Sequence, residues 1–166
     1  MIAQKCGFCH GVRNAIRVAN QTLEAEPNVY CLGPIIHNRD MVEQLSANGL
    51  KTVDTAEEIL SGTVLIRSHG AAPEEIEKLG EKGLKIVDAT CVLVKRVQHI
   101  ASEFEKEGYK VVIIGEEDHP EVQAVVGCAE DVIVITEESD IHKLPEHTKL
   151  GIVCQTIPSF VCSGSL

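Results

Sequence analysis

Two cysteines and two histidines recur at one spacing along the chain. Cys9 and Cys91 are 82 residues apart, and so are His37 and His119. Thiolates bind soft metal ions and iron–sulfur clusters, while imidazoles bind metal ions or donate hydrogen bonds to anions. A thiol and an imidazole that return together at one spacing indicate that one structural unit has been copied. We expect each copy to supply one of each to a shared site.

The hydrophobic pattern keeps the same spacing. Val29–Leu32 corresponds to Val111–Ile114, and each run is followed by a glycine, Gly33 or Gly115. Short apolar runs that end in turn residues are typical of strands. The other predicted strands are Ile2–Gln4, Val64–Ile66, Leu84–Val87, Val132–Ile135 and Gly151–Cys154.

Helices are predicted between these strands. Apolar residues keep helical spacing from Val12 to Leu23 and from Val94 to Phe104, and Pro73 is placed to begin a third helix. Alternating strands and helices predict an α/β fold of tandem repeated small domains with mostly parallel sheets. The repeat places the domains at residues 1–89 and 90–166, the second with a C-terminal tail.

Composition excludes several classes of function. The net charge of −10 disfavours a nucleic-acid surface or an anionic membrane as partner, and no apolar run is long enough to span a bilayer. Seven cysteines without an export signal indicate reduced thiols and a cytoplasmic location rather than a disulfide framework. The 3% aromatic content argues against base stacking.

Cys9 and Cys91 are the candidate metal ligands. Each precedes a predicted helix, and a helix start favours the thiolate, which is the form that binds metal. The alternative, a small buried hydrophobic residue, fits a lone cysteine better than a repeated pair. Cys6 and Cys9 also form a C-x-x-C pair, which alone fits a redox pair or half of a zinc site.

The histidines His37, His69 and His119 each follow a predicted strand, in turns that enter helices. Carboxyl ends of parallel strands and helix starts are where oxyanions bind, which favours a diphosphate site over solvated surface histidines. Glu121 follows His119-Pro120. It is either a dipole-stabilising acid or a proton donor, and a donor must be held neutral by burial or nearby negative charge. Thr156 could offer a hydroxyl to the same substrate.

These motifs together resemble one enzyme family over essentially the whole chain and in the same order. The segments are Gly7-Phe8-Cys9, Gly33-Pro34-Ile35-Ile36-His37-Asn38, Ser68-His69-Gly70, Asp88-Ala89-Thr90-Cys91, His119-Pro120-Glu121-Val122 and Gln155-Thr156. They resemble the 4-hydroxy-3-methylbut-2-enyl diphosphate reductases, which catalyse the last step of the methylerythritol phosphate route to isoprenoids.

The resemblance implies three similar α/β domains around a [4Fe-4S] cluster held by three cysteines, of which Cys9 and Cys91 would be two. It implies that His37, His69, His119 and Thr156 contact the substrate and that Glu121 supplies a proton. The implied reaction is a reductive dehydroxylation. The apical iron takes the allylic hydroxyl, ferredoxin or flavodoxin gives two electrons, and isopentenyl and dimethylallyl diphosphate form.

The sequence departs from the family pattern at several places. The third domain is expected to be absent, and with it the third cluster cysteine and the partner against which residues 1–10 would pack. Val92 stands where the family usually has proline, and Ile157 where it has a second threonine. The alternative is therefore a truncated or non-catalytic diphosphate-binding module of the same fold. A missing domain also predicts an exposed apolar face.

Overall fold

The structure is a computed structural model of the chain, and it describes residues 7–156. Contacts divide these residues into two compact units. The first contains the described residues up to Gly70 together with Glu74–Val92, and the second contains Ala71–Pro73 and the described residues from Leu93 onward. The predicted boundary between residues 89 and 90 concerns the sequence copies and stays a prediction. The predicted strand Ile2–Gln4 lies outside the described residues.

The first unit has one four-stranded sheet in the order β2-β1-β3-β4, and every pair is parallel. Its strands are β1 (Val29–Leu32), β2 (Leu50–Val53), β3 (Thr63–Ile66) and β4 (Lys85–Asp88). Its helices are α1 (His10–Ala25), α2 (Arg39–Ala47), the short 3-10 helix η1 (Ala56–Glu58) and α3 (Pro73–Glu81).

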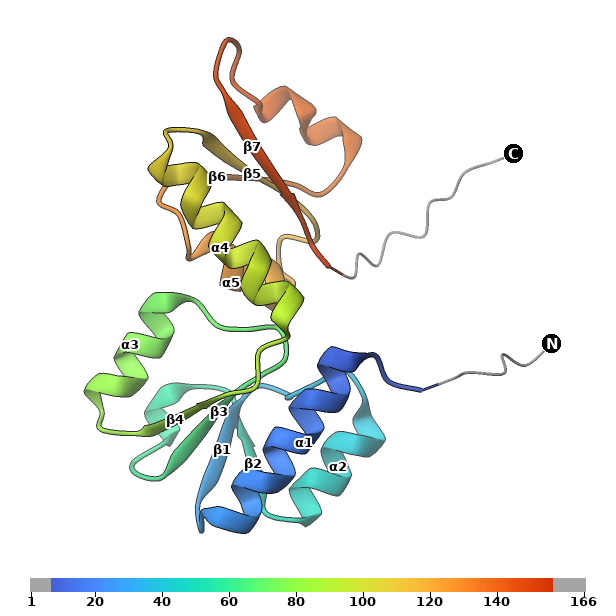
Figure 1. Ribbon diagram of the computed structural model, residues 1–166, viewed down its shortest axis with the longest axis vertical. Helices are drawn as coiled ribbons and strands as arrows, with labels where there is room; N and C mark the ends of the chain where they lie inside the picture. The colour runs from blue at the N-terminus through green and yellow to red at the C-terminus, as the bar shows by residue number, and fades with distance from the viewer. Residues whose placement is uncertain (1–6, 157–166) are drawn as a thin grey trace, which may run out of the picture. The chain divides into compact units, whose positions relative to one another are not determined.

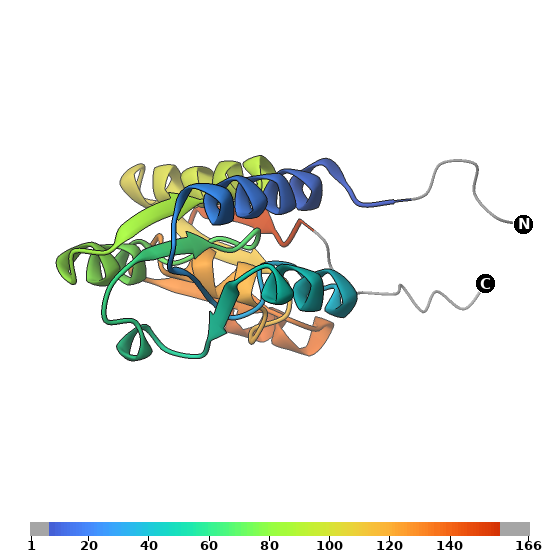
Figure 2. The same cartoon turned by 90° about the horizontal axis from the view of Figure 1, so that it is seen from below.

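Chain direction explains where these helices lie. The crossover from β1 to β2 runs one way along the sheet, and the crossover from β3 to β4 runs the other way. Because parallel crossovers are right-handed, α2 and α3 cover opposite faces. Figures 1 and 2 show α1 and α2 together on one side of this sheet, and Figure 1 shows α3 on the other. Ala15 and Ala19 of α1 and Leu45 of α2 share one core with the buried β1 residues Val29 and Cys31.

The second unit repeats this arrangement in a parallel sheet of order β6-β5-β7. Its strands are β5 (Lys110–Ile114), β6 (Val132–Ile135) and β7 (Leu150–Cys154), and its helices are α4 (Val92–Lys106), α5 (Pro120–Val126) and the 3-10 helix η2 (Glu138–Lys143). Residues of α4 and α5, including Ala101 and Val125, pack on one face of the sheet against Val111, Ile113 and Val153.

The expected α/β class with parallel sheets is confirmed, and the expected strands occur with ends shifted by at most one residue. The sequence reasoning missed β2, and it expected a helix after His37 without giving the bounds of α2. In β2 only Leu50 is buried, while Lys51 and Thr52 are exposed at the sheet edge, so its apolar signal is weak. Within residues 7–156, no helix is both long and apolar enough to cross a bilayer.

Candidate functional site

Two thiols converge on the start of α1. Cys9 is the N-cap residue of this helix, and its Sγ accepts a hydrogen bond from Val12 N at 3.5 Å. A Cβ built on Gly11 would lie 3.9 Å from Cys9 Sγ and only 2.5 Å from Cys91 Sγ. Glycine is therefore needed here, because any side chain would occupy the space that the second sulfur fills.

The loop after β4 brings Cys91 to this position. Ala89 N donates to Ile66 O at 3.0 Å and Cys91 N donates to Ser68 O at 2.9 Å, which fastens the loop to the end of β3. Asp88 accepts from Thr90 N at 2.8 Å within the same turn. Cys9 is exposed and Cys91 half-buried, and both belong to the first unit.

His37 and His69 form a pair at the carboxyl ends of β1 and β3. Their ring centroids are 4.3 Å apart, with 41° between the ring planes. Ser68 N donates to Ile35 O at 3.1 Å, which joins the two loops that carry the rings. His37 is exposed and His69 half-buried. The first unit thus holds two of the predicted imidazoles side by side at strand ends.

In the second unit, His119 is the N-cap residue of α5. Its Nδ1 accepts a hydrogen bond from Glu121 N at 3.1 Å, while Pro120 occupies the first turn, where no backbone N–H is needed. Because Nδ1 accepts, the neutral ring carries its proton on Nε2. Nε2 is then the donor nitrogen of this ring.

Glu121 is buried, with 3% of its surface exposed, and lies against the end of β7. Its Oε1 accepts from Thr156 N at 2.6 Å, and its Oε2 accepts from the Thr156 hydroxyl at 2.9 Å. Both carboxyl oxygens are therefore held by one residue. The structure joins Thr156 to the predicted proton donor, and its expected contact with a substrate stays a prediction.

Gln155 supports the loop that precedes His119. Its side-chain Oε1 accepts from Glu116 N at 3.0 Å, and a Cβ on Gly115 would lie 2.8 Å from that oxygen. Gln155 is 4% exposed. The sequence reasoning missed this support, because the residues inserted near Leu144–Thr148 separate Gln155 from the 82-residue register.

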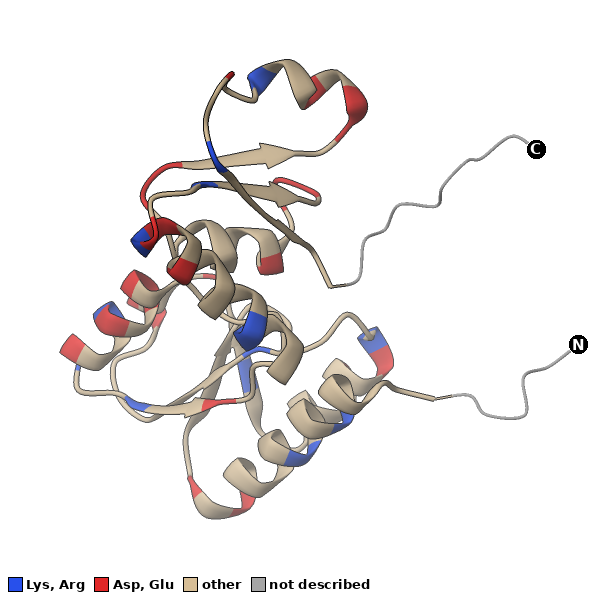
Figure 3. Ribbon diagram, turned by 45° about the horizontal axis from the view of Figure 1, so that its top comes forward, with Lys and Arg blue, Asp and Glu red and all other residues tan. Residues whose placement is uncertain are grey.

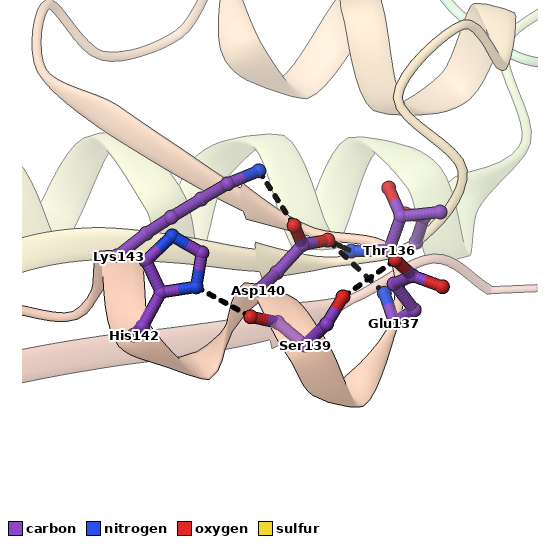
Figure 4. A network of polar contacts seen from close by, with 7 residues as sticks. Thr136, Glu137, Ser139, Asp140, His142 and Lys143 are labelled. Carbon is purple, nitrogen blue, oxygen red and sulfur yellow. Dashed lines mark hydrogen bonds and ion pairs between the residues drawn. The ribbon is translucent and has the colours of Figure 1, made fainter.

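An open hollow of about 570 Å³ lies beside His119, and most of its lining residues are acidic. Asp140 anchors its far wall. The Asp140 carboxylate accepts from Thr136 N and Glu137 N at 2.8 and 3.1 Å and pairs with Lys143 at 2.7 Å (Figure 4). The Lys143 ammonium and then these backbone N–H groups lower the pKa of Asp140 to about 2. Figure 3 shows other acidic positions on both units, on α3 and on η2.

The thiol pair can serve as two ligands of one soft-metal centre. Two free cysteine sulfurs lie within 4 Å of a single point, which is the arrangement that iron–sulfur clusters use. The residues therefore fit an iron–sulfur cluster as two of its thiolates. Cys6 of the C-x-x-C pair lies outside the described residues.

Fold and side chains together define a class of protein. It is an α/β protein of two repeated parallel-sheet units that carries thiols, imidazoles and a buried carboxyl group at strand ends and helix starts. The model of the LytB protein family matches residues 1–160. The chain belongs to the LytB family.

Curated relatives give the same result. The chain is 42% identical over 161 residues to the 4-hydroxy-3-methylbut-2-enyl diphosphate reductase of Geobacter metallireducens, covering 96% of this chain and 57% of the relative. Identity to the Syntrophotalea carbinolica reductase is 42% over 162 residues, covering 96% of this chain and 58% of the relative. The chain thus spans little more than half the length of these relatives.

Solved structures agree with the fold. One is an (E)-4-hydroxy-3-methyl-but-2-enyl diphosphate reductase, described as the terminal enzyme of the non-mevalonate pathway, with 43% identity and a TM-score of 0.82 over 94% of this chain and 57% of that one. The Plasmodium falciparum reductase has 28% identity and a TM-score of 0.88 over 92% of this chain and 50% of that one.

Proposed function

We propose that this chain carries out, or contributes to, the reductive dehydroxylation of 4-hydroxy-3-methylbut-2-enyl diphosphate to isopentenyl and dimethylallyl diphosphate in the cytoplasm. The observation that carries the proposal is the convergence of Cys9 and Cys91 on Gly11 in a member of the LytB family. The reductase relatives support the substrate and the class of reaction.

Cys9 and Cys91 would hold a [4Fe-4S] cluster through two of its irons. When bound, the cluster supplies electrons one at a time and an iron Lewis acid for the allylic hydroxyl. Ferredoxin or flavodoxin is the proposed electron donor. The reaction takes up two electrons and two protons, the allylic C–O bond breaks, and one water molecule leaves.

The imidazoles bind the diphosphate in this proposal. His37 and His69 lie together at the ends of two neighbouring strands, and Nε2 is the donor nitrogen of His119 because its Nδ1 accepts from Glu121 N. Ring N–H donors at helix starts suit phosphate oxygens, since the helix dipole adds to the hydrogen bonds.

Glu121 and Thr156 handle the proton. Thr156 N holds Oε1 of the carboxyl group, so a proton carried by Glu121 sits on Oε2 and is donated to the Thr156 hydroxyl oxygen 2.9 Å away, which then accepts and turns its own proton outward. Hydrogen-bonded oxygens at this distance exchange protons readily. The threonine hydroxyl passes the proton outward, and the burial of Glu121 keeps bulk water from doing so.

Anaerobic reconstitution with iron and sulfide tests the cluster. We expect visible charge-transfer absorbance and a paramagnetic signal after reduction, and both should be lost in Cys91→Ser. Cys128→Ser is the matched control, because that half-buried thiol donates to Ala124 O inside α5 and should leave iron content unchanged. Absence of bound iron in the unsubstituted chain would contradict the proposal.

The second candidate is a diphosphate-binding module without turnover. Two observations favour it. The chain spans only 57% of the Geobacter metallireducens relative, and the described residues bring together two thiols, whereas the family resemblance implies three cluster ligands. Calorimetry with the substrate diphosphate separates the two. Binding that His69→Ala weakens, without turnover by the reconstituted chain, supports the module, and turnover supports the reductase.

A further inference from the structure

The connection from β3 to α3 is divided between the two units. Ala71–Pro73, which we call the connector, belong to the second unit, although the described residues up to Gly70 and those from Glu74 to Val92 belong to the first. The connector begins two residues after His69, one of the predicted substrate contacts. Whatever holds the connector in the second unit therefore also limits how far the loop that carries His69 can move.

One side chain of α4 binds the connector. Gln98 Nε2 donates to Ala71 O at 3.1 Å and to Ala124 O of α5 at 3.2 Å, and both alanines are buried. Ala124 O lies in the last turn of α5, where Cys128 N bonds to Val125 O, so besides the weak bond from the Cys128 thiol it needs a donor from outside the helix. The two N–H groups of one amide thus serve two buried carbonyl groups from segments far apart in the sequence.

A close packing contact adds to these hydrogen bonds. A Cβ built on Gly127, the C-cap residue of α5, would lie 2.4 Å from Ala72 Cβ and 3.7 Å from Pro73 Cδ. The φ angle of Gly127 is −66°, which any residue can adopt, so glycine is needed here for space and not for backbone freedom. The connector therefore lies directly against the end of α5.

Both contact positions differ from the first copy of the repeat. Gln98 corresponds to Ile16 and Gly127 to Leu45 at the 82-residue spacing. Leu45 is buried in the core of the first unit, and Ile16 packs against the same core. The second unit thus has an amide where the first has an apolar side chain and no side chain where the first has leucine, and each difference costs apolar burial. Both differences fall where the connector binds, so they supply its hydrogen bonds and its space.

We infer that Gln98 is a positioning residue of the diphosphate site and that Gly127 makes room for the segment that it binds. The amide fastens the segment after His69 to α5, the helix whose N-cap is His119. On the other side of His69, backbone hydrogen bonds of Ser68 fix the same loop to the loops after β1 and β4. A loop held on both sides of its imidazole loses little conformational entropy when an anion binds. The inference rests on the proposed function, because it deepens the role of His69 in it.

Amide exchange followed by NMR tests the docking without any ligand. Gln98→Met nearly keeps the size of the side chain and removes both donors, so two buried carbonyl groups lose a partner. We expect the Gly70 amide, which donates to Arg67 O, to exchange about tenfold faster, while the amides of β5 stay unchanged. His99→Met is the matched control, because His99 is the next residue of α4 and its side chain is 71% exposed. Equal exchange of the Gly70 amide in Gln98→Met and the unsubstituted chain would overturn the inference.

Moving one methyl group tests the packing contact. Gly127→Ala should displace the connector and speed exchange of the Gly70 amide in the same way, because its Cβ would overlap Ala72 Cβ. In the double variant, Ala72→Gly removes that Cβ and leaves Ala72 Cα 3.3 Å away, so the exchange rate should return toward that of the unsubstituted chain. A general loss of stability would not be reversed by removing a second methyl group. Exchange that stays fast in the double variant argues against the docking.

Calorimetry with inorganic diphosphate tests the positioning role. We expect Gln98→Met to raise the Kd by about fivefold or more and to leave the iron content after reconstitution unchanged, while His99→Met changes neither. An unchanged Kd in Gln98→Met, combined with faster exchange of the Gly70 amide, would overturn the positioning role. If the unsubstituted chain binds no diphosphate, the proposed function fails, and the exchange rates still decide whether Gln98 holds the connector.

Discussion

The two units use one scaffold to carry different chemistry. Strand order, parallel register and capped 3-10 helix recur, yet the residues at equivalent positions differ. Position 39 holds an exposed arginine paired with Glu43, whereas position 121 holds a buried glutamate bonded to Thr156. Above the glycine that follows the central strand lies Arg67 in the first unit and Gln155 in the second. The two units therefore share the backbone positions of these residues but differ in the side chains and charges that the positions carry.

The helix starts diverge in the same way. Asn38, next to His37, caps α2 by accepting from Met41 N at 2.9 Å, whereas His119 itself caps α5. His37 therefore does not cap its helix, whereas the capping bond fixes the tautomer of His119. Both copies therefore have a histidine after the central strand. The N-cap is the residue after this histidine in the first unit and the histidine itself in the second, so only His119 uses its Nδ1 to accept a capping hydrogen bond.

The largest expected effect concerns core volume. Gly151 lies under Phe104, with ring and Cβ atoms of Phe104 less than 3.0 Å from where a Cβ would be. The equivalent residues of the first unit are Thr63 and Thr22, and both are buried. Gly151→Ala should lower the free energy of unfolding by roughly 1–3 kcal/mol in denaturant titrations. Phe104→Leu should restore part of this loss in the double variant, and independent, additive losses would contradict the steric explanation.

Equivalent positions of the two units hold a buried and an exposed polar residue, Glu121 and Arg39. Glu121→Gln should cost roughly 1–3 kcal/mol, because the Thr156 hydroxyl loses a carboxylate acceptor in a buried place. Arg39→Gln removes an ion pair whose side chains are 90% and 62% exposed, so the loss should be under about 0.5 kcal/mol. Chemical denaturation of both variants provides the measurement. Equal costs would mean that Glu121 is not held as described.

The sequence predicted much of this because repetition is a strong signal. Cys9, Cys91, His37 and His119 share one spacing, and their apolar strands carry the same period. Contacts between residues far apart in the sequence could not be predicted from this repeat. Nothing local connects Glu121 to Thr156, since the bond depends on where β7 ends after an insertion. The proximity of Cys91 to Gly11 likewise depends on the loop after β4 being bonded to Ser68.

The central strands of the two sheets should respond differently to pH. Cys31 of β1 is equivalent to Ile113 of β5, and both are buried. Burial raises the pKa of the Cys31 thiol from 9.0 to about 12, a rise that Arg67 partly offsets. The folded state thus holds the proton more tightly than the unfolded chain, so stability is complete below pH about 9 and falls as pH rises toward 12.

Cys31→Val should remove this alkaline loss, which amounts to about 1 kcal/mol at pH 10. Urea titrations at pH 8 and pH 10 measure it in both proteins. Cys154→Val is the control, because that thiol is exposed and its removal should leave the pH dependence in place. The same slope in Cys31→Val and the unsubstituted chain would show that other groups cause the loss.

The smallest effect compares the two capped 3-10 helices. Glu58 accepts from Asp54 N and Thr55 N, both at 2.9 Å, and the equivalent Asp140 accepts from Thr136 N and Glu137 N. Only the second cap adds an ion pair with a lysine three residues later, Lys143. The pKa of Asp140 is lowered from 3.8 to about 2, so its contribution to the free energy of unfolding is present above pH about 4 and is lost as pH falls through 2.

Asp140→Asn should therefore reduce the pH dependence of the free energy of unfolding between pH 4 and 2, and Lys143→Met should reduce it in part. Because the backbone bonds remain in Lys143→Met, a complete loss of the acid dependence there would assign the low pKa to the ion pair alone and would remove the parallel with Glu58.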